Sequence, residues 1–382
     1  MSVIICGMTQ MGEYISDNIY DEKKVPVKPV AFVDNNVKSQ GMSVNDIPVI
    51  SFEKLLLKDD IAEMTALIAV KNSRNIFQIM EQLEQLGIKN IGVVKARVVV
   101  SKVMIELQEE SEEIIWKKFE GKRNFIIPRI ETNLIDACNL KCKGCSHFSS
   151  IYSRESHYYL NDYKNDILQL RKVGKLLRIR LLGGEPFLLD NLDEYIDITR
   201  DIFSETDIEI VTNGLLIPNA SEKVLLSIKK CKVCVTISLY KPTLEKAQQI
   251  AERLDKYNIW WQFDGDKIEE FSRRYTLENT HNALMANKNC LSSSCTFLRK
   301  GKLYKCPFEG LVNDFYQYYG LNKKYEGGIE LDQEPDILYE KIVQYISNPI
   351  DMCQCCVEIP EMIPWSVVAN PILQDWLYMD GI

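Results

Sequence analysis

Three closely spaced cysteines constrain the fold of this chain more than any other feature. Cys138, Cys142 and Cys145 have the spacing C-x3-C-x2-C, and the run before them, residues 126–135, is largely apolar and partly alternating. Such a run predicts a buried strand that leads into the cysteine loop. Three thiolates on one tight loop can hold three corners of a four-iron cluster and leave the fourth iron open to a small molecule.

A disulfide, a zinc site and three unrelated core cysteines are the alternatives for this loop. A disulfide fits poorly with an odd number of adjacent cysteines in a chain that shows no secretory segment. Zinc could take His147 as a fourth ligand, although zinc sites more often use two separated ligand pairs. A zinc-stabilised scaffold without chemistry therefore stays open as an alternative.

The composition restricts the class of protein further. The chain has 382 residues and a net charge of −8, which predicts two or three domains and argues against nucleic acid as a partner. It has no apolar run long enough to span a bilayer and no signal peptide, so we expect a cytoplasmic protein. In a reducing compartment its 12 cysteines indicate metal or catalysis rather than disulfides.

Residues 1–98 predict a small Rossmann-like parallel sheet, because strand-like and helical runs alternate there. Gly7 and Gly12 form a turn after the first strand and Asp34 ends the second, which is where a nucleotide would bind. Thr9 occupies the position where a dinucleotide fold needs glycine, so full dinucleotide binding is not expected. The expected elements are strands at 2–6, 29–33, 66–70 and 90–94 and a helix at 74–86.

The same segment resembles a known domain. Phe32-Val33-Asp34, followed by residues 47–50 and 52–55, resembles the small Rossmann-like domain at the front of nucleotide-sugar epimerases and sugar acetyltransferases. The resemblance implies nucleotide-sugar binding, and a scaffold or oligomerisation domain without a ligand is the alternative. Residues 99–124 are rich in charge and helical in period, so we expect a helical linker there.

Residues 125–265 predict a partial (β/α) barrel as the core of the chain. After the cysteine loop, helices and strands alternate and give five strands in all. The expected helices are 160–173, 190–202, 222–230 and 244–257, and the further strands are 177–182, 208–212, 233–239 and 260–263. In parallel barrels the chemistry lies at the carboxyl ends of the strands. The residues found there are Gly183, Gly184, Glu185, Pro186, Thr212, Asn213 and Ser238.

Together these motifs resemble the radical S-adenosylmethionine (radical SAM) enzymes. In that family the three cysteines bind a [4Fe-4S] cluster, whose open iron takes the amino and carboxylate groups of S-adenosyl-L-methionine. The residues matching GGEP hold the methionine amino group, and the later strand ends contact the ribose and the carboxylate. The resemblance implies reductive cleavage to a 5′-deoxyadenosyl radical, with an external one-electron donor such as flavodoxin or ferredoxin. Gly144 departs from the family, which commonly has an aromatic residue there that contacts adenine.

Residues 266–382 carry a second group of cysteines. Gly301 suits a tight hairpin, and a separated pair of cysteines plus a C-x2-C pair could close a cluster or a structural zinc site. The pattern resembles the twitch version of the SPASM extension, which holds one auxiliary [4Fe-4S] cluster in some radical SAM enzymes, including aminocyclitol dehydrogenases. The matching residues are Cys290, Cys306, Cys353 and Cys356. Cys295 and Cys355 are extra, and either could replace a neighbour as ligand.

The two resemblances imply an enzyme that abstracts hydrogen from a carbohydrate-like small molecule, such as a nucleotide-linked sugar, and leads to oxidation or epimerisation. In an epimerisation a thiol returns hydrogen, and Cys295 or Cys355 would be the donor. A radical SAM peptide maturase is the alternative, because auxiliary clusters are common there too. The tail, residues 359–382, is expected to pack as core through its aromatic residues rather than to form a lid.

Overall fold

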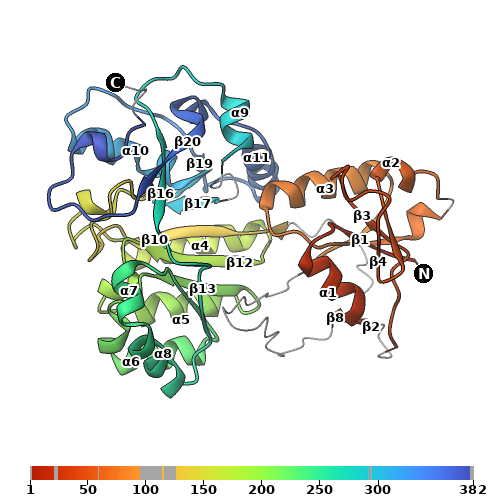
Figure 1. Ribbon diagram of the computed structural model, residues 1–382, viewed down its shortest axis with the longest axis horizontal. Helices are drawn as coiled ribbons and strands as arrows, with labels where there is room; N and C mark the ends of the chain where they lie inside the picture. Colours follow the sequence, from red (N-terminus) through yellow and green to blue (C-terminus); the bar gives the residue numbers. More distant parts are fainter. Residues whose placement is uncertain are drawn as a thin grey trace. The chain divides into compact units, whose positions relative to one another are not determined.

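The protein consists of two compact units, Met1–Arg123 and Asn124–Ile382, in a computed structural model (Figure 1). The structure describes residues 2–20, 25–58, 60–94, 114–115, 126–290, 292 and 295–378. Most of the expected linker, residues 99–124, lies outside the described residues, and within it Ile114–Ile115 form the short strand β8. Among the described helices, none has the length and apolar character that crossing a membrane requires.

The first unit is built on a six-stranded sheet with the order β4-β5-β3-β1-β6-β7, in which only β4 is antiparallel to its neighbour. This confirms the expected N-terminal parallel sheet. The strands are β1 (Val3–Cys6), β3 (Ala31–Val33), β4 (Ser43–Val44), β5 (Ile47–Ile50), β6 (Thr65–Ile68) and β7 (Asn90–Val93). A further short strand, β2 (Ile19–Tyr20), pairs with β8.

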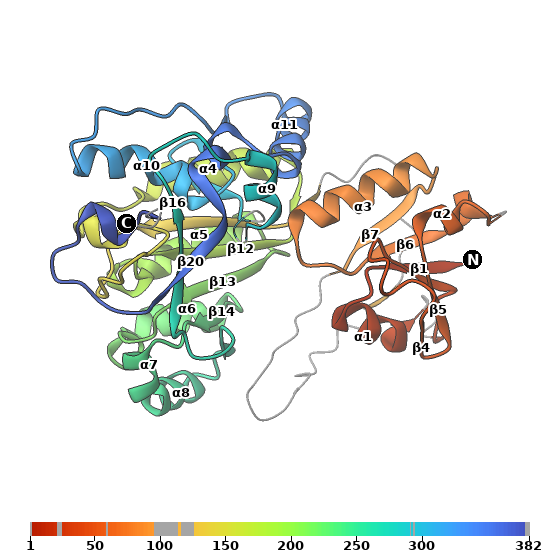
Figure 2. The same cartoon turned by 45° about the horizontal axis from the view of Figure 1, so that its top comes forward.

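Helices cover both faces of this sheet, which explains why its central strands β1 and β3 are apolar and buried at every position. Val3 and Ile5 of β1 pack with helix α1 (Gln10–Asn18), whereas Ile4 and Cys6 pack with helix α3 (Ser73–Gln85). Alternate residues of a strand point to opposite faces, so each face of β1 meets a different helix. The short helix α2 (Phe52–Leu55) lies with α3 on the second face (Figure 2).

The second unit is organised around an eight-stranded sheet with the order β15-β14-β13-β12-β10-β17-β18-β19. The strands from β15 to β17 are parallel, and β18 and β19 continue the sheet antiparallel. The sheet ends at β15 and β19 without closing, as a partial barrel does. Its strands are β10 (Ile130–Ile135), β12 (Arg178–Gly183), β13 (Asp207–Thr212), β14 (Cys234–Ile237), β15 (Trp261–Phe263), β17 (Phe297–Arg299), β18 (Lys302–Tyr304) and β19 (Ile329–Glu330).

The structure adds strands and breaks to the expected pattern. β17 gives a sixth parallel strand, drawn from residues that the sequence had assigned to the C-terminal domain. The expected strand at 126–135 is divided into β9 (Ile126–Ile127) and β10, because Pro128 lies between them and cannot donate to a ladder. β9 pairs instead with β11 (Lys175–Leu176).

Helices follow the parallel strands in the expected order. α4 (Leu160–Val173) and α6 (Glu222–Lys230) have the expected bounds, and α5 (Leu192–Ile202) begins two residues late. The helix expected at 244–257 is two helices, α7 (Lys241–Glu245) and α8 (Ala247–Lys256), because the backbone leaves the helical conformation at Lys246.

The C-terminal part of this unit adds a two-stranded ribbon and three helices. Strand β16 (Glu270–Tyr275) runs antiparallel to β20 (Cys356–Pro364), side by side in both views (Figures 1 and 2). The helices are α9 (Ala283–Lys288), α10 (Pro307–Tyr318) and α11 (Pro335–Ser347). Phe148, Phe308, Phe315 and Trp376 form an aromatic core, so the tail packs as core at Trp376, as expected.

Candidate functional site

The cysteine loop and the Gly-Gly-Glu-Pro loop are joined backbone to backbone. The Gly184 N–H donates to the carbonyl of Ile135 at 2.8 Å, and the Glu185 N–H donates to that of Ala137 at 3.0 Å. A Cβ atom on Gly184 would lie 2.0 Å from the Ala137 carbonyl oxygen. Glycine is therefore required for the two loops to approach this closely.

Glu185 connects the Gly-Gly-Glu-Pro loop to the end of the next strand. Its buried carboxylate accepts hydrogen bonds from the Thr212 hydroxyl at 2.7 Å, the Asn213 N–H at 2.9 Å and the Phe187 N–H at 3.1 Å. Burial raises the pKa of Glu185 to about 7, although these three hydrogen bonds act in the opposite direction. Pro186 continues from this carboxylate into the short 3-10 helix Pro186–Leu188.

Asn213 extends this network to the first cysteine. Its side-chain amide donates to the Asn139 side-chain oxygen at 2.7 Å and to Cys138 Sγ at 3.6 Å. Ser238, at the end of β14, donates its backbone N–H to the Thr212 carbonyl at 2.9 Å. The carboxyl ends of β10, β12, β13 and β14 are thus linked to one another, and the sequence analysis predicted the chemistry at these strand ends.

The three thiols of the cysteine loop share one partly buried neighbour, Tyr240. Burial, together with the thiols of Cys142, Cys145 and Cys138, raises the pKa of Tyr240 well above its usual range. Donors also approach the sulfurs, because Cys138 Sγ accepts from the Leu140 N–H at 3.3 Å and Cys142 Sγ accepts from the Trp365 indole N–H at 3.3 Å. N–H donors to sulfur stabilise thiolate ligands of an iron–sulfur cluster.

The surroundings of these thiols fit a multinuclear cluster. Burial raises the pKa of Cys142 to about 12 and also raises that of Cys138, so the two thiols would need the positive charge of a bound metal to be held as thiolates. Within the described ranges, no three His, Cys, Asp or Glu side chains stand close enough to hold one metal ion. A four-iron cluster takes each thiolate on a different iron, so its ligands stand further apart than those of zinc.

His147 does not turn toward the cysteines. Its Nδ1 lies 2.9 Å from the side-chain oxygen of Asn133 on β10, and its ring meets the ring of Phe297 edge-on. Burial lowers the pKa of His147. This arrangement gives no support to His147 as a fourth zinc ligand.

The cysteines of the C-terminal part also share a tyrosine. Burial, with the thiols of Cys306, Cys356 and Cys290, raises the pKa of Tyr275 well above its usual range. Burial also raises the pKa of Cys353, and the Cys290 thiol is among the smaller causes. These are the four cysteines that the sequence proposed as ligands of a second cluster.

Cys295 and Cys355 each have a hydrogen-bond partner outside the four cysteines, although the Cys353 thiol is a neighbour of Cys355. Cys295 Sγ accepts a hydrogen bond from Arg129 Nη2 at 3.0 Å and lies near Glu131, on the main sheet. Cys355 is buried and its Sγ donates to the Asn279 side-chain oxygen at 2.8 Å. The two extra cysteines therefore have different surroundings, although the sequence treated them alike.

A polar face of the main sheet was missed by the sequence analysis. We give this name, the polar face, to Glu131, Arg180 and Glu209, which are register neighbours on β10, β12 and β13. Arg180 Nη1 donates to Glu131 at 2.8 Å, and Arg180 Nε lies 3.2 Å from Glu209. Most of their neighbours along the three strands are apolar and buried, namely Ile130, Ile179, Leu181, Ile208 and Ile210. The signal was present in the sequence, since fully covered parallel strands are usually apolar throughout.

The Gly7 to Gly12 turn of the first unit satisfies its own donors. The Met8 N–H donates to the Asp34 carboxylate at 2.5 Å, and the Gly12 N–H donates to the Thr9 hydroxyl at 3.1 Å. A Cβ atom on Gly12 would lie 2.4 Å from the Gly7 carbonyl oxygen, so this turn is tight. Two amide donors that a phosphate would use already have side-chain acceptors, and nucleotide binding here stays a prediction.

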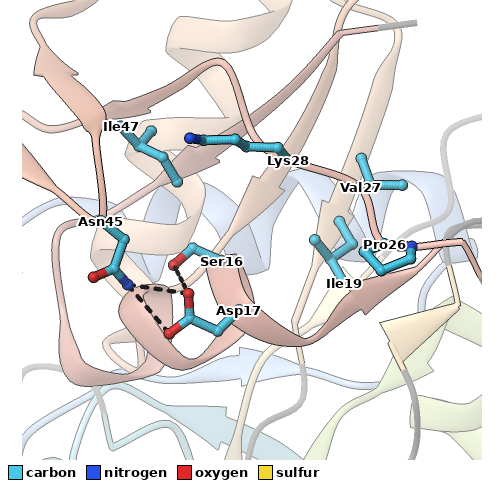
Figure 3. Close-up of a pocket in the computed structure, with 8 residues that line it drawn as sticks. All are labelled: Ser16, Asp17, Ile19, Pro26, Val27, Lys28, Asn45 and Ile47. Carbon is cyan, nitrogen blue, oxygen red and sulfur yellow. Dashed lines mark hydrogen bonds between the residues drawn. The ribbon is translucent and has the colours of Figure 1, made fainter.

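The first unit has a hollow of about 220 Å³ at the other end of helix α1 (Figure 3). Asp17 and Lys28 lie on its lining, and the Asn45 amide donates to both Asp17 carboxylate oxygens at 3.0 and 3.2 Å. This hollow is separate from the turn that the sequence singled out.

The partial barrel, the three-cysteine loop and the linked strand ends are the features that the sequence analysis associated with the radical SAM enzymes. Residues 132–240 match the family model described as the radical SAM superfamily, and this segment contains the cysteine loop, the Gly-Gly-Glu-Pro loop and Asn213. The match confirms the class of enzyme that the motifs predicted, while the reaction type is a separate question.

Curated relatives match only a part of this chain. The GTP 3',8-cyclase of Alkaliphilus oremlandii is 31% identical over 93 residues, which cover 24% of this chain and 28% of that protein. The GTP 3',8-cyclase of Clostridium botulinum (strain Hall) is 33% identical over 97 residues, which cover 25% and 30%. The chain thus spans less than a third of the length of these relatives.

The structural similarity between this chain and the solved structures that it matches is low. The crystal structure of BtrN in complex with AdoMet and 2-DOIA has a TM-score of 0.37 and 19% identity, covering 61% of this chain and 95% of that one. Streptococcus suis SuiB bound to S-adenosylmethionine has a TM-score of 0.30 and 17% identity, covering 35% and 33%.

Proposed function

We propose that this radical SAM enzyme abstracts hydrogen from a carbohydrate-like substrate, such as a sugar, a nucleotide-sugar or an aminocyclitol, and that oxidation or epimerisation follows. The observation that carries the proposal is the polar face. A polyhydroxylated molecule exposes many donors and acceptors and little apolar surface, so it binds where polar side chains converge. The polar face offers carboxylates and a guanidinium on the strands whose ends bear the candidate cofactor residues.

Neutral hydrogen-bonding groups extend this polar surface. Asn133 is two residues beyond Glu131 and so shares its side of β10, and its amide donates to Asp136 at 2.9 Å. Thr236 and Gln262, on β14 and β15, are register neighbours and are joined by a hydrogen bond of 3.1 Å. Amides and hydroxyls of this kind match the hydroxyl groups of a sugar.

The residues of the sheet edge have separate proposed roles. Cys138, Cys142 and Cys145 would hold the [4Fe-4S] cluster, and Glu185 would keep the Gly-Gly-Glu-Pro loop and Asn213 in fixed relation. The cluster and S-adenosyl-L-methionine, when bound, supply the carbon radical that takes a hydrogen atom from the substrate. The residues proposed to bind this cosubstrate are Gly183, Gly184, Glu185, Pro186, Thr212, Asn213 and Ser238.

The two outcomes need different residues. For oxidation, Cys290, Cys306, Cys353 and Cys356 would hold an auxiliary [4Fe-4S] cluster that accepts the electron of the substrate radical. For epimerisation, a thiol would return hydrogen, and Cys295 is the better supported donor because its neighbours are Arg129, which precedes β10, and Glu131 of β10. The Cys355 thiol is engaged with Asn279.

A product analysis tests the proposal. Reduced, reconstituted protein is incubated anaerobically with S-adenosyl-L-methionine and a panel of sugars, nucleotide-sugars and aminocyclitols, and the products are analysed by mass spectrometry. Oxidation removes two hydrogen atoms from the substrate, whereas epimerisation in D2O replaces one carbon-bound hydrogen of the substrate with deuterium. Cys295→Ala would retain oxidation and lose epimerisation. Turnover of a tightly bound leader peptide, with no turnover of any polyhydroxylated compound, would favour a peptide maturase instead.

A further inference from the structure

The C-terminal tail runs along the three-cysteine loop. The Lys143 N–H donates to the Ser366 carbonyl at 2.9 Å, and the Val368 N–H donates to the Lys141 carbonyl at 2.8 Å. Cys142 and Val367 form the β-bridge between these bonds. Both views show the dark blue C-terminal segment next to the yellow segment that follows β10 (Figures 1 and 2).

Side chains reinforce this attachment on both sides of the bridge. Lys143 Nζ lies 3.3 Å from the carboxylate of Asp375, and the Trp376 indole N–H donates to the Cys145 carbonyl at 3.1 Å. A Cβ atom on Gly144 would lie 3.0 Å from Ile363 Cδ1. Because Gly144 has no side chain, Ile363 of the tail can lie in close contact with the loop at this position.

Trp365 is the tail residue that reaches a sulfur. Its indole N–H donates to Cys142 Sγ at 3.3 Å, across 223 positions of sequence. Its ring stacks on Tyr240, with the ring centroids 5.4 Å apart and the planes at 26°. The stacking fixes the plane of the indole, so its N–H is held in the direction of the sulfur.

We infer that Trp365 is a positioning residue of the three-cysteine site, whose indole N–H stabilises negative charge on the Cys142 sulfur and so makes a cluster held there easier to reduce. The inference rests on the proposed function only in assigning a cluster to this loop. Reduction adds an electron to the cluster and its sulfurs, so a donor to one sulfur stabilises the reduced form more than the oxidised form. Hydrogen bonds to sulfur are among the features that set cluster potentials.

Trp365→Phe tests this inference, because phenylalanine keeps an aromatic ring against Tyr240 and removes the N–H. We expect the equilibrium constant for one-electron reduction of this cluster to fall about tenfold, which is about 59 mV for a one-electron couple. The measurement is an anaerobic redox titration followed by electron paramagnetic resonance, in which the signal that changes on adding S-adenosyl-L-methionine identifies the cluster. The other cluster signal should keep its potential.

Trp376→Phe is the matched control. It removes an indole N–H of the same tail that bonds to the same loop, but to a carbonyl oxygen and not to a sulfur. An unchanged potential in Trp365→Phe would overturn the inference. An equal shift in both variants would also overturn it, because the effect would then come from a loosened tail.

A measurement on the wild-type protein covers the case in which Trp365→Phe binds no iron. With ¹⁵N-labelled tryptophan, the reduced cluster should show a hyperfine coupling to an indole nitrogen, and the absence of this coupling contradicts the inference. Iron content separates this result from a failure of the proposed function. Wild-type protein that takes up no iron at the three cysteines contradicts the proposed function, whereas loaded wild-type protein without the coupling contradicts only the role of Trp365.

Discussion

The carboxylate of Glu185 accepts a hydrogen bond of 2.7 Å from the hydroxyl of Thr212, although Glu185 follows β12 and Thr212 is the last residue of β13. The bond joins the loop after β12 to the end of β13, and Asn213 continues the connection to Cys138. One buried carboxylate therefore helps to connect three segments that the sequence analysis identified separately: the Gly-Gly-Glu-Pro loop, the end of β13 and the cysteine loop.

This carboxylate predicts a pH dependence of stability. Because burial raises the pKa of Glu185 from 4.5 to about 7, the folded protein holds this proton more tightly than the unfolded chain. Its contribution to stability is complete below about pH 4.5 and is lost as the pH rises to about 7, with an upper limit of about 3 kcal/mol. We expect Glu185→Gln to weaken the loss of stability between pH 5 and pH 8 in urea unfolding of the metal-free protein. An identical loss in wild type and variant contradicts the assignment.

Gly184→Ala should push the Gly-Gly-Glu-Pro loop away from the cysteine loop. The new Cβ atom would meet the Ala137 carbonyl oxygen at 2.0 Å, and backbone cannot yield as a flexible side chain does. We expect the variant to lose most of the iron bound at the three-cysteine loop and to melt at a lower temperature. Gly320→Ala is the control, because its Cβ would meet nothing within 4 Å and only its positive φ of 62° is unfavourable. Equal iron content in both variants would count against the close approach.

From the polar face we predict that replacing its one arginine lowers the free energy of unfolding substantially. Arg180 stands between Glu131 and Glu209, and its side chain is only 17% exposed. Arg180→Met leaves both carboxylates without this guanidinium and should lower the free energy of unfolding by about 3 kcal/mol. Lys175→Met removes the cation of an exposed pair with Glu205, and we expect a change of about 0.5 kcal/mol. Similar values from denaturant unfolding of the two variants would contradict the burial of this network.

The second group of cysteines leads to a prediction about the iron content of two cysteine variants. Cys306 shares Tyr275 as a neighbour with Cys290 and Cys356, so Cys306→Ala should remove about one cluster's share of iron and sulfide. Cys355→Ala is the matched control, because the Cys355 thiol bonds to Asn279. We expect its iron content to equal that of the wild type, and a loss of iron in Cys355→Ala alone would reassign the ligands.

Local patterns in the sequence predicted the parts of the fold that depend on neighbouring residues. The bounds of α4 and α6 follow from helical periodicity, and the strand ends with their glycines and polar residues follow from strand–helix alternation. The polar face could not be derived in this way. The ion pairs of the polar face depend on how strands distant in sequence align. Arg180 and Glu131, for example, are 49 residues apart in sequence and become neighbours through the register of β10 and β12.

Two further features depend on contacts between distant segments. Trp365 reaches Cys142 only because the tail pairs with the cysteine loop, and the sequence identified Trp365 merely as an aromatic residue of the tail. The difference between Cys295 and Cys355 arises from Arg129 and Asn279, which neither cysteine has near it in sequence. Tertiary packing, and not local composition, decides these assignments.

The central claim is that the three-cysteine loop holds the cluster that splits S-adenosyl-L-methionine. The most direct test measures 5′-deoxyadenosine released by anaerobically reconstituted, reduced protein, next to a variant with Cys138, Cys142 and Cys145 all changed to alanine. We predict release by the wild type and none by the triple variant, which should keep the iron of the second cysteine group. Release by the triple variant, or no release by iron-loaded wild type with or without candidate sugars, would contradict the account.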